Sequence, residues 1–94
     1  MASARKWHFL WVLVFLAPDT PGVVELWEND ELLYVGSSRE SIRGRLVREL
    51  DGLPGLREHA THFGWEIISE PERREAELLA AFRAEHHRAP RFNG

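Results

Sequence analysis

Two short apolar-rich runs in the first half of the chain predict a β-hairpin. The runs span residues 23–27 and 32–35, and the polar residues 28–30 separate them. Valine and aromatic side chains favour strands, and so short a polar connection favours an antiparallel pair. We therefore expect residues 22–36 to form a tight hairpin.

The segment that follows the hairpin has the pattern of a capped amphipathic helix. Residues 37–40 read Ser-Ser-Arg-Glu, a capping-box pattern in which a serine oxygen and the glutamate satisfy the first free amides of a helix. Ile42, Leu46 and Leu50 then recur at a spacing of four, which places them on one buried face. Glycine and proline in residues 51–55 predict that this helix ends near Leu50.

A third strand and a second helix are predicted in the second half of the chain. Apolar and polar residues alternate through 62–69, which is the period of a half-buried strand. The apolar side of this strand carries Phe63, Trp65 and Ile67. A second capping-box pattern, Ser-Glu-Pro-Glu, follows at 69–72, so a helix should start there, run to about residue 86 and be closed by Pro90.

The order of these elements, hairpin, helix, strand and helix, predicts a small α/β (α+β) domain. Its helices would cover a three-stranded, mainly antiparallel sheet. A chain of 94 residues allows one domain with a modest core. Its apolar fraction of 44% and charged fraction of 29% are typical of a soluble globular protein.

The amino-terminal segment differs from the rest, so we divide the chain into a leader, residues 1–20, and a domain, residues 21–94. The leader has a charged start and an apolar run over 7–17, which is too short for a bilayer span of about 20 residues. Two interpretations are open: a strand or helix that packs on the core, or a signal or membrane anchor. Pro18 disfavours cleavage, and the absence of cysteine favours a cytoplasmic protein.

Glu75 lies where a carboxylate is unexpected. At about 100° per residue, Leu78, Leu79 and Phe82 fall in one narrow arc of the second helix, and Glu75 falls within it, whereas Glu77 points to the opposite side. A buried carboxylate must be hydrogen-bonded, protonated or bound to a cation. The alternative is a partly hydrated glutamate that the helix dipole stabilises.

The predicted first helix and its start carry a group of arginines: Arg39, Arg43, Arg45 and Arg48. Guanidinium groups pair with phosphate oxygens and stay charged at neutral pH. The alternative is a solvated helix face that neighbouring carboxylates balance. The net charge of -3 excludes a strongly basic nucleic-acid binder but allows a local basic patch. Arg45 flanks the buried face, so it is best placed to reach a site over the sheet.

Taken together, these residues resemble the GIY-YIG nuclease domain, which is named for two tripeptides on adjacent strands. Gly-Val-Val at 22–24 stands at the first tripeptide, and Tyr-Val-Gly at 34–36 stands at the second. Residues 42–46 are similar to the arginine motif of the family, and residues 75–79 are similar to its glutamate motif. Pro-Arg-Phe-Asn at 90–93 resembles the segment that closes many such domains.

The resemblance implies an endonuclease that uses Mg²⁺ or Mn²⁺ and cleaves DNA. Glu75 would bind the metal, Arg45 would neutralise phosphate charge and Tyr34 would assist the attacking water, because charge that develops in the transition state must be stabilised. Tyr34, Arg45 and Glu75 are the implied catalytic residues. The candidate nucleic-acid contacts are Arg39, Arg43, Arg48 and Asn93.

The first motif is degenerate, because Val24 stands where a tyrosine is expected. Valine offers no proton acceptor, and loss of general-base assistance costs about 10²–10⁴-fold in rate. The alternative is therefore a catalytically impaired GIY-YIG-like module that binds nucleic acid or a protein. The chain would act alone, as a homodimer or with a protein partner. A third interpretation is a membrane-associated or exported protein that the leader anchors.

Overall fold

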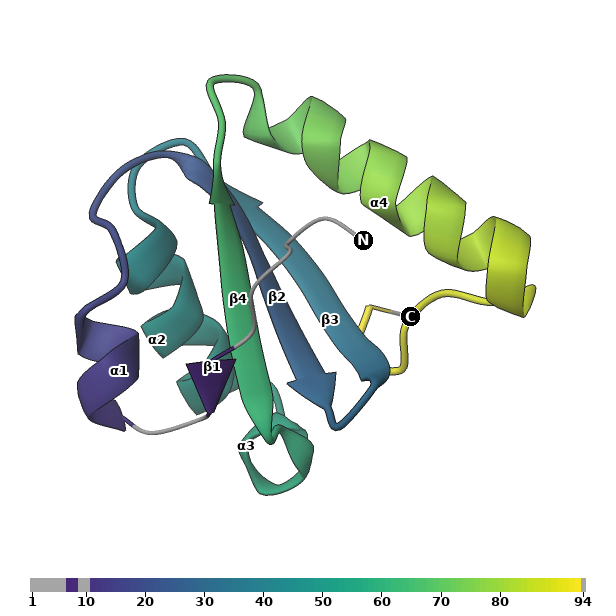
Figure 1. Ribbon diagram of the computed structural model, residues 1–94, viewed down its shortest axis with the longest axis horizontal. Helices are drawn as coiled ribbons and strands as arrows, with labels where there is room; N and C mark the ends of the chain where they lie inside the picture. Colours follow the sequence, from purple (N-terminus) through teal and green to yellow (C-terminus); the bar gives the residue numbers. More distant parts are fainter. Residues whose placement is uncertain (1–6, 9–10, 94) are drawn as a thin grey trace.

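An antiparallel sheet forms the centre of the molecule. The structure is a computed structural model that describes residues 7–8 and 11–93 (Figure 1). Its elements are β1 (Trp7–His8), α1 (Trp11–Phe15), β2 (Gly22–Glu28), β3 (Glu31–Ser38), α2 (Ile42–Gly52), α3 (Leu56–His59), β4 (His62–Ile67) and α4 (Pro71–His86). The strand order is β1-β4-β2-β3.

The predicted α/β (α+β) class is confirmed. Strands β4, β2 and β3 form the predicted three-stranded antiparallel sheet, and helices cover it. β1 adds a short strand that pairs with β4, with Trp7 opposite Phe63. The hairpin turn lies where the sequence predicted it, and Asn29 adopts a φ of 52°, a left-handed conformation that asparagine tolerates.

The two faces of the sheet pack on different helices (Figure 1). On one face, Val24 and Leu26 pack with Leu46 of α2 in the main core cluster. On the other face, Val23 and Val35 pack with Leu78 of α4. Successive residues of a strand point to opposite sides, so the hairpin supports both helices.

A β-bulge in β3 decides which face Tyr34 joins. Leu26 pairs with Tyr34 and Trp27 pairs with Leu32, so Leu33 is an extra residue without a partner in this register. Leu33 and Tyr34 consequently both belong to the cluster on the α2 face, although they are consecutive. The bulge thus directs the phenol toward α2.

The first predicted capping box is wrong. β3 continues through Ser38, and the N-cap of α2 is Ser41, whose side-chain oxygen accepts a hydrogen bond from the amide of Gly44. Ser38 Oγ instead accepts hydrogen bonds from the amides of Glu40 and Ser41, and so shapes the turn before the helix. Several serines compete for these amides, and pairing with β2 keeps residues 37–38 in the strand.

The start of α4 and the end of β4 also differ from the prediction. Glu70 is the N-cap of α4, it makes no side-chain capping bond, and Pro71 opens the helix. Ile67 is 63% exposed, because it lies at the end of β4 beyond the core cluster that holds Phe63. The short helix α3 was not predicted.

Part of the predicted leader packs against the domain. Val14 and Ala17 belong to the main core cluster. The amide of Ile42 donates to the carbonyl of Thr20, and the amide of Arg43 donates to the carbonyl of Pro18. The division at residue 20 stays a prediction, because residues 1–6 and 9–10 lie outside the described residues. No helix among the described residues has the length and apolar character needed to span a membrane.

Candidate active site

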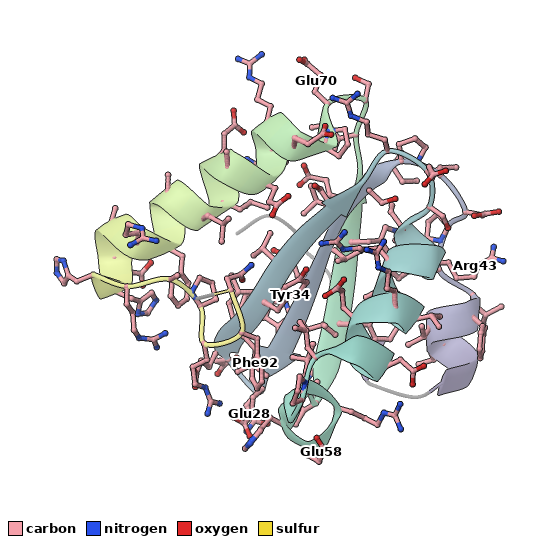
Figure 2. All side chains as sticks on the ribbon, turned by 180° about the vertical axis from the view of Figure 1, so that it is seen from behind. Glu28, Tyr34, Arg43, Glu58, Glu70 and Phe92 are labelled. Carbon is pink, nitrogen blue, oxygen red and sulfur yellow. The ribbon has the colours of Figure 1, made fainter. Side chains whose placement is uncertain are left out.

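Tyr34 and Arg45 meet on the α2 face of the sheet. The Nη2 group of Arg45 donates a hydrogen bond of 2.9 Å to the phenol oxygen of Tyr34. The Arg45 side chain is 26% exposed, and its contact with Tyr34 of β3 places it over the sheet, as its position beside Leu46 predicted. Figure 2 shows Tyr34 at the sheet, facing α2.

Gly36 makes room for the ring of Tyr34. A β-carbon at this position would lie 2.8 Å from both the phenol oxygen and a ring carbon of Tyr34, which is closer than side chains tolerate. The glycine of the second tripeptide therefore has a physical reason: it lets the ring fold back across the strand.

Electrostatics keep Tyr34 protonated and Arg45 charged. Burial above all raises the pKa of Tyr34, Arg45 lowers it, and Glu49 raises it. Burial lowers the pKa of Arg45, but its hydrogen bond to Tyr34 and the nearby carboxylates outweigh burial, so the net direction is upward. Glu75 is among those carboxylates, which places its charge within reach of Arg45.

Glu75 of α4 contacts β3 from the other face of the sheet. Its side chain is half-buried, and its Oε1 accepts a hydrogen bond of 2.5 Å from Ser37 Oγ on β3. The helical position of Glu75 predicted a carboxylate that faces the sheet, and this contact agrees with it. Glu77 instead is exposed and pairs with Arg74.

Ser37 and Glu49 are site residues that sequence reasoning missed. Ser37 was assigned to a helix cap, although it is the third residue after Tyr34 on the same strand. Glu49 is one of the carboxylates that would balance a solvated helix face, and its spacing of four from Arg45 is the signal for a helical ion pair. Glu49 Oε1 lies 3.3 Å from Arg45 Nε, and its side chain is only 13% exposed.

A pocket of about 290 Å³ opens beside these residues. It is lined by Ser37, Ser38, Arg39, Glu40, Ser41, Gly44, Arg45 and Arg48. Arg39 pairs with Glu72 of α4, and its hydrogen bond above all lowers the pKa of Glu72. Arg48 is exposed and has no ion pair or hydrogen bond within the described part of the chain. Three guanidinium groups at one opening suit a phosphate.

Two other candidate contacts with nucleic acid have partners within the protein. Arg43 Nε donates to the carbonyl of Ala17, so this side chain lies toward α1 and away from Tyr34 (Figure 2). Asn93 lies at the outer edge of β3, where its Oδ1 accepts from the amide of Val35 and its Nδ2 donates to the carbonyl of Val35. Both contacts stabilise the fold, and a role in binding nucleic acid stays a prediction.

Val24 is fully buried opposite Gly36. It lies on the α2 face of the sheet with Tyr34 and packs in the main core cluster. Its side chain supplies packing, and the assignment of this position to a family tyrosine stays a prediction.

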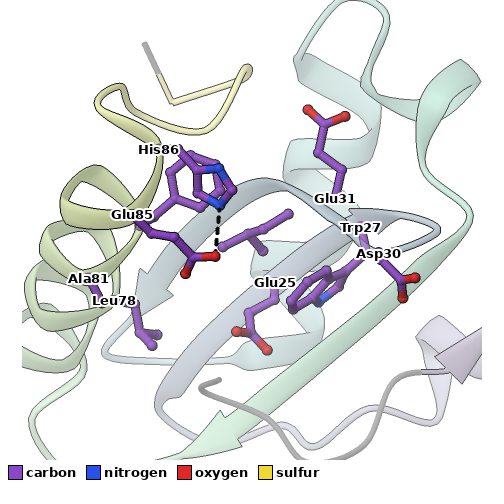
Figure 3. Close-up of a pocket in the computed structure, with 10 residues that line it drawn as sticks. Glu25, Trp27, Asp30, Glu31, Leu78, Ala81, Glu85 and His86 are labelled. Atoms are coloured by element: carbon purple, nitrogen blue, oxygen red, sulfur yellow. Dashed lines mark ion pairs between the residues drawn. The ribbon is translucent and has the colours of Figure 1, made fainter.

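A larger pocket of about 560 Å³ lies between α4 and the hairpin (Figure 3). Its lining includes the carboxylates of Glu25, Asp30, Glu31 and Glu85. A phosphodiester is an anion, and such a lining would repel it. The smaller, arginine-lined pocket is therefore the candidate active site.

The oxygen groups at Glu75 fit a hydrated magnesium ion. No cluster of three or more histidine, cysteine, aspartate or glutamate side chains that could hold a metal occurs in residues 7–8 and 11–93. Magnesium does not need such a cluster, because it keeps several waters and is commonly bound by one or two carboxylates plus substrate phosphate. Glu75 and the Ser37 hydroxyl are hard oxygen ligands of the kind that it prefers.

Comparisons with known proteins identify the fold. No protein-family model matches the chain, and no curated protein matches it. Among solved structures, the GIY-YIG N-terminal endonuclease domain of UvrC from Thermotoga maritima, bound to magnesium as its catalytic divalent cation, is 22% identical. The match covers 89% of this chain and 94% of that chain, with a TM-score of 0.65.

Point mutants of the same UvrC domain match as well. One of them, bound to the catalytic divalent cation, is 22% identical over 89% of this chain and 93% of that chain, with a TM-score of 0.66. Another is 21% identical over 87% of this chain and 91% of that chain, with a TM-score of 0.64. With its antiparallel sheet between α2 and α4, the chain has the GIY-YIG fold.

Proposed function

We propose that this protein is a divalent-metal-dependent endonuclease that hydrolyses phosphodiester bonds in DNA. The observation that carries the proposal is that contacts from the two faces of the sheet meet at one pocket. Arg45 contacts Tyr34 directly, Glu75 is bonded to Ser37 three residues further along the same strand, and Ser37 and Arg45 line one pocket. Two residues that line the opening are thus hydrogen-bonded to residues distant in sequence: Arg45 to the phenol of Tyr34, and Ser37 to the carboxylate of Glu75.

The residues of this opening suit phosphoryl chemistry. Arg45 and Arg48 would neutralise charge on the phosphate oxygens, and the protein fixes Arg45 in advance through Tyr34 and Glu49. Ser37 would orient the Glu75 carboxylate. A Mg²⁺ or Mn²⁺ ion bound at Glu75 would supply positive charge at the phosphate when present.

DNA is the proposed substrate because the cations of a net acidic chain gather at this opening. The overall charge is -3, yet Arg39, Arg45 and Arg48 line one pocket. A local cluster attracts a polyanion more strongly than the net charge indicates. The similar structures are endonuclease domains, which supports the same class of reaction.

Nicking of a supercoiled plasmid tests the proposal. We expect the wild type to nick the plasmid with added Mg²⁺ or Mn²⁺, and Glu75→Ala and chelation with EDTA to abolish nicking. Glu77→Gln is the matched control, because Glu77 is an exposed glutamate of the same helix that pairs with Arg74, and it should nick like the wild type.

Two results would count against an endonuclease. Nicking that survives Glu75→Ala in purified protein points to a contaminant. Binding of DNA that weakens with salt, without any nicking by the wild type, would instead support the catalytically impaired binding module.

A further inference from the structure

Glu49 and Tyr34 share one edge of the Arg45 guanidinium. Nη2 contacts the phenol oxygen at 2.9 Å, and Nε, which lies on the same edge, is 3.3 Å from Glu49 Oε1. Tyr34 and Glu49 thus contact one edge of the same guanidinium, by a hydrogen bond at Nη2 and by an ion pair without a hydrogen bond at Nε. Glu49 also raises the pKa of Tyr34, in keeping with a carboxylate near the phenol.

The phenol hydrogen of Tyr34 needs an acceptor other than Arg45. Arg45 only donates hydrogen bonds, and the phenol oxygen accepts one of them, so the phenol hydrogen points elsewhere. The Glu49 carboxylate, which pairs with the same guanidinium, is the candidate acceptor. Because its side chain is only 13% exposed, bulk water competes little for it.

Tyr34 can act as a base only if it loses its own proton. A phenol is protonated at neutral pH even with its ordinary pKa, and burial raises the pKa of Tyr34 further. A protonated phenol can take a proton from an attacking water only while it passes its own proton to a neighbour. Val24 offers no acceptor, and Glu75 is engaged by Ser37 on the α4 face.

We propose that Glu49 is the proton acceptor of this site and works through Tyr34. This inference rests on the proposed endonuclease function. The water oxygen bonds to phosphorus while the bond from phosphorus to the leaving oxygen breaks. The water proton passes to the phenol oxygen of Tyr34, the phenol proton passes to the Glu49 carboxylate, and the leaving oxygen takes a proton from solvent.

Tyr34 is the only tyrosine in the chain, so its ionisation can be followed by ultraviolet absorbance without interference from another phenol. Glu49 raises the pKa of Tyr34, so Glu49→Gln should lower that pKa. Arg45 lowers it, so Arg45→Met should raise it. Glu58→Gln, an exposed carboxylate of α3, is the control and should leave the titration unchanged.

Cleavage kinetics separate proton transfer from mere support of Arg45. We expect Glu49→Gln to slow plasmid nicking by about 10²–10⁴-fold, the usual range for loss of a general base. On the acidic limb of the pH profile, the logarithm of kcat/KM for Glu49→Gln should fall less steeply toward low pH than for the wild type, by the slope that one proton contributes. Glu49→Asp, which keeps a carboxylate, should retain that limb, and Glu58→Gln should match the wild type.

Each result decides the inference. If Glu49→Gln nicks plasmid as fast as the wild type and keeps the acidic limb, the proton transfer is overturned and the proposed function stands. An unchanged pKa of Tyr34 in Glu49→Gln has the same consequence. No nicking by the wild type overturns the proposed function and the proton transfer together. If Glu49→Gln does not fold, as judged by circular dichroism, Glu49→Asp tests the inference instead. Its side chain is one methylene shorter, so its carboxylate lies farther from Tyr34. Slower cleavage by that variant supports the inference, and unchanged cleavage overturns it.

Discussion

At the scale of single residues, the side chains around Tyr34 distinguish this protein, and Val24 is the clearest case. It is fully buried on the same face of the sheet as Tyr34 and contributes packing where a phenol would be expected. Glu49 of α2 pairs with Arg45, which also contacts Tyr34. A carboxylate in that position would make a second phenol unnecessary.

Substitution of Val24 tests this interpretation. Val24→Tyr and Val24→Phe both overfill a packed core, so each should lower the free energy of unfolding by about 1–3 kcal/mol, measured by chemical denaturation. The two variants differ only in the phenol hydroxyl. We expect them to nick plasmid at equal rates, because Glu49 already accepts the proton, and faster nicking by Val24→Tyr would show that the hydroxyl is the missing group.

Helix starts illustrate what matters at the scale of elements. Two Ser-x-x-Glu patterns predicted two caps, yet only Ser41, which lies outside both patterns, caps α2 with its side chain. A capping serine must have extended backbone at the point where a helix begins. That point is set by where β3 ends, which a local pattern does not determine.

Ser41→Ala should therefore destabilise the protein by about 0.5–2 kcal/mol, because the amide of Gly44 loses its acceptor. Ser69→Ala is the matched control: Ser69 is an exposed serine of the second pattern, so its substitution should change stability by less than about 0.5 kcal/mol. Thermal unfolding of both variants measures the difference. An equal loss in the two variants would contradict the assigned cap.

The sequence predicted the class, the three main strands and the two long helices, because each has a clear hydrophobic period. It also indicated that Arg45 and Glu75 face the sheet, because the position of a residue along a helix determines the side on which its side chain lies. The contact between Ser37 and Glu75 spans 38 residues, and no local period encodes it. The β-bulge at Leu33 was equally hidden, although it directs Tyr34 toward Arg45.

At the scale of the whole molecule, the outer edge of β3 is hydrogen-bonded to a segment distant in sequence, residues 92–93. The amide of Phe92 donates to the carbonyl of Leu33, and Asn93 bonds both backbone groups of Val35. Asn93 and Val35 are 58 residues apart in the sequence. The segment after α4 therefore lies along β3 as a neighbouring strand would.

The contacts of Asn93 with β3 should limit self-association of the protein at high concentration. β3 is an outermost strand, and bare outer strands invite edge-to-edge association with other chains. Asn93→Ala should free both groups of Val35 and promote concentration-dependent self-association, measured by sedimentation velocity. Asn93→Asp keeps the acceptor for the Val35 amide, so it should aggregate less than Asn93→Ala. One asparagine side chain would thus protect the solubility of the whole protein, in addition to any part it has near the active site.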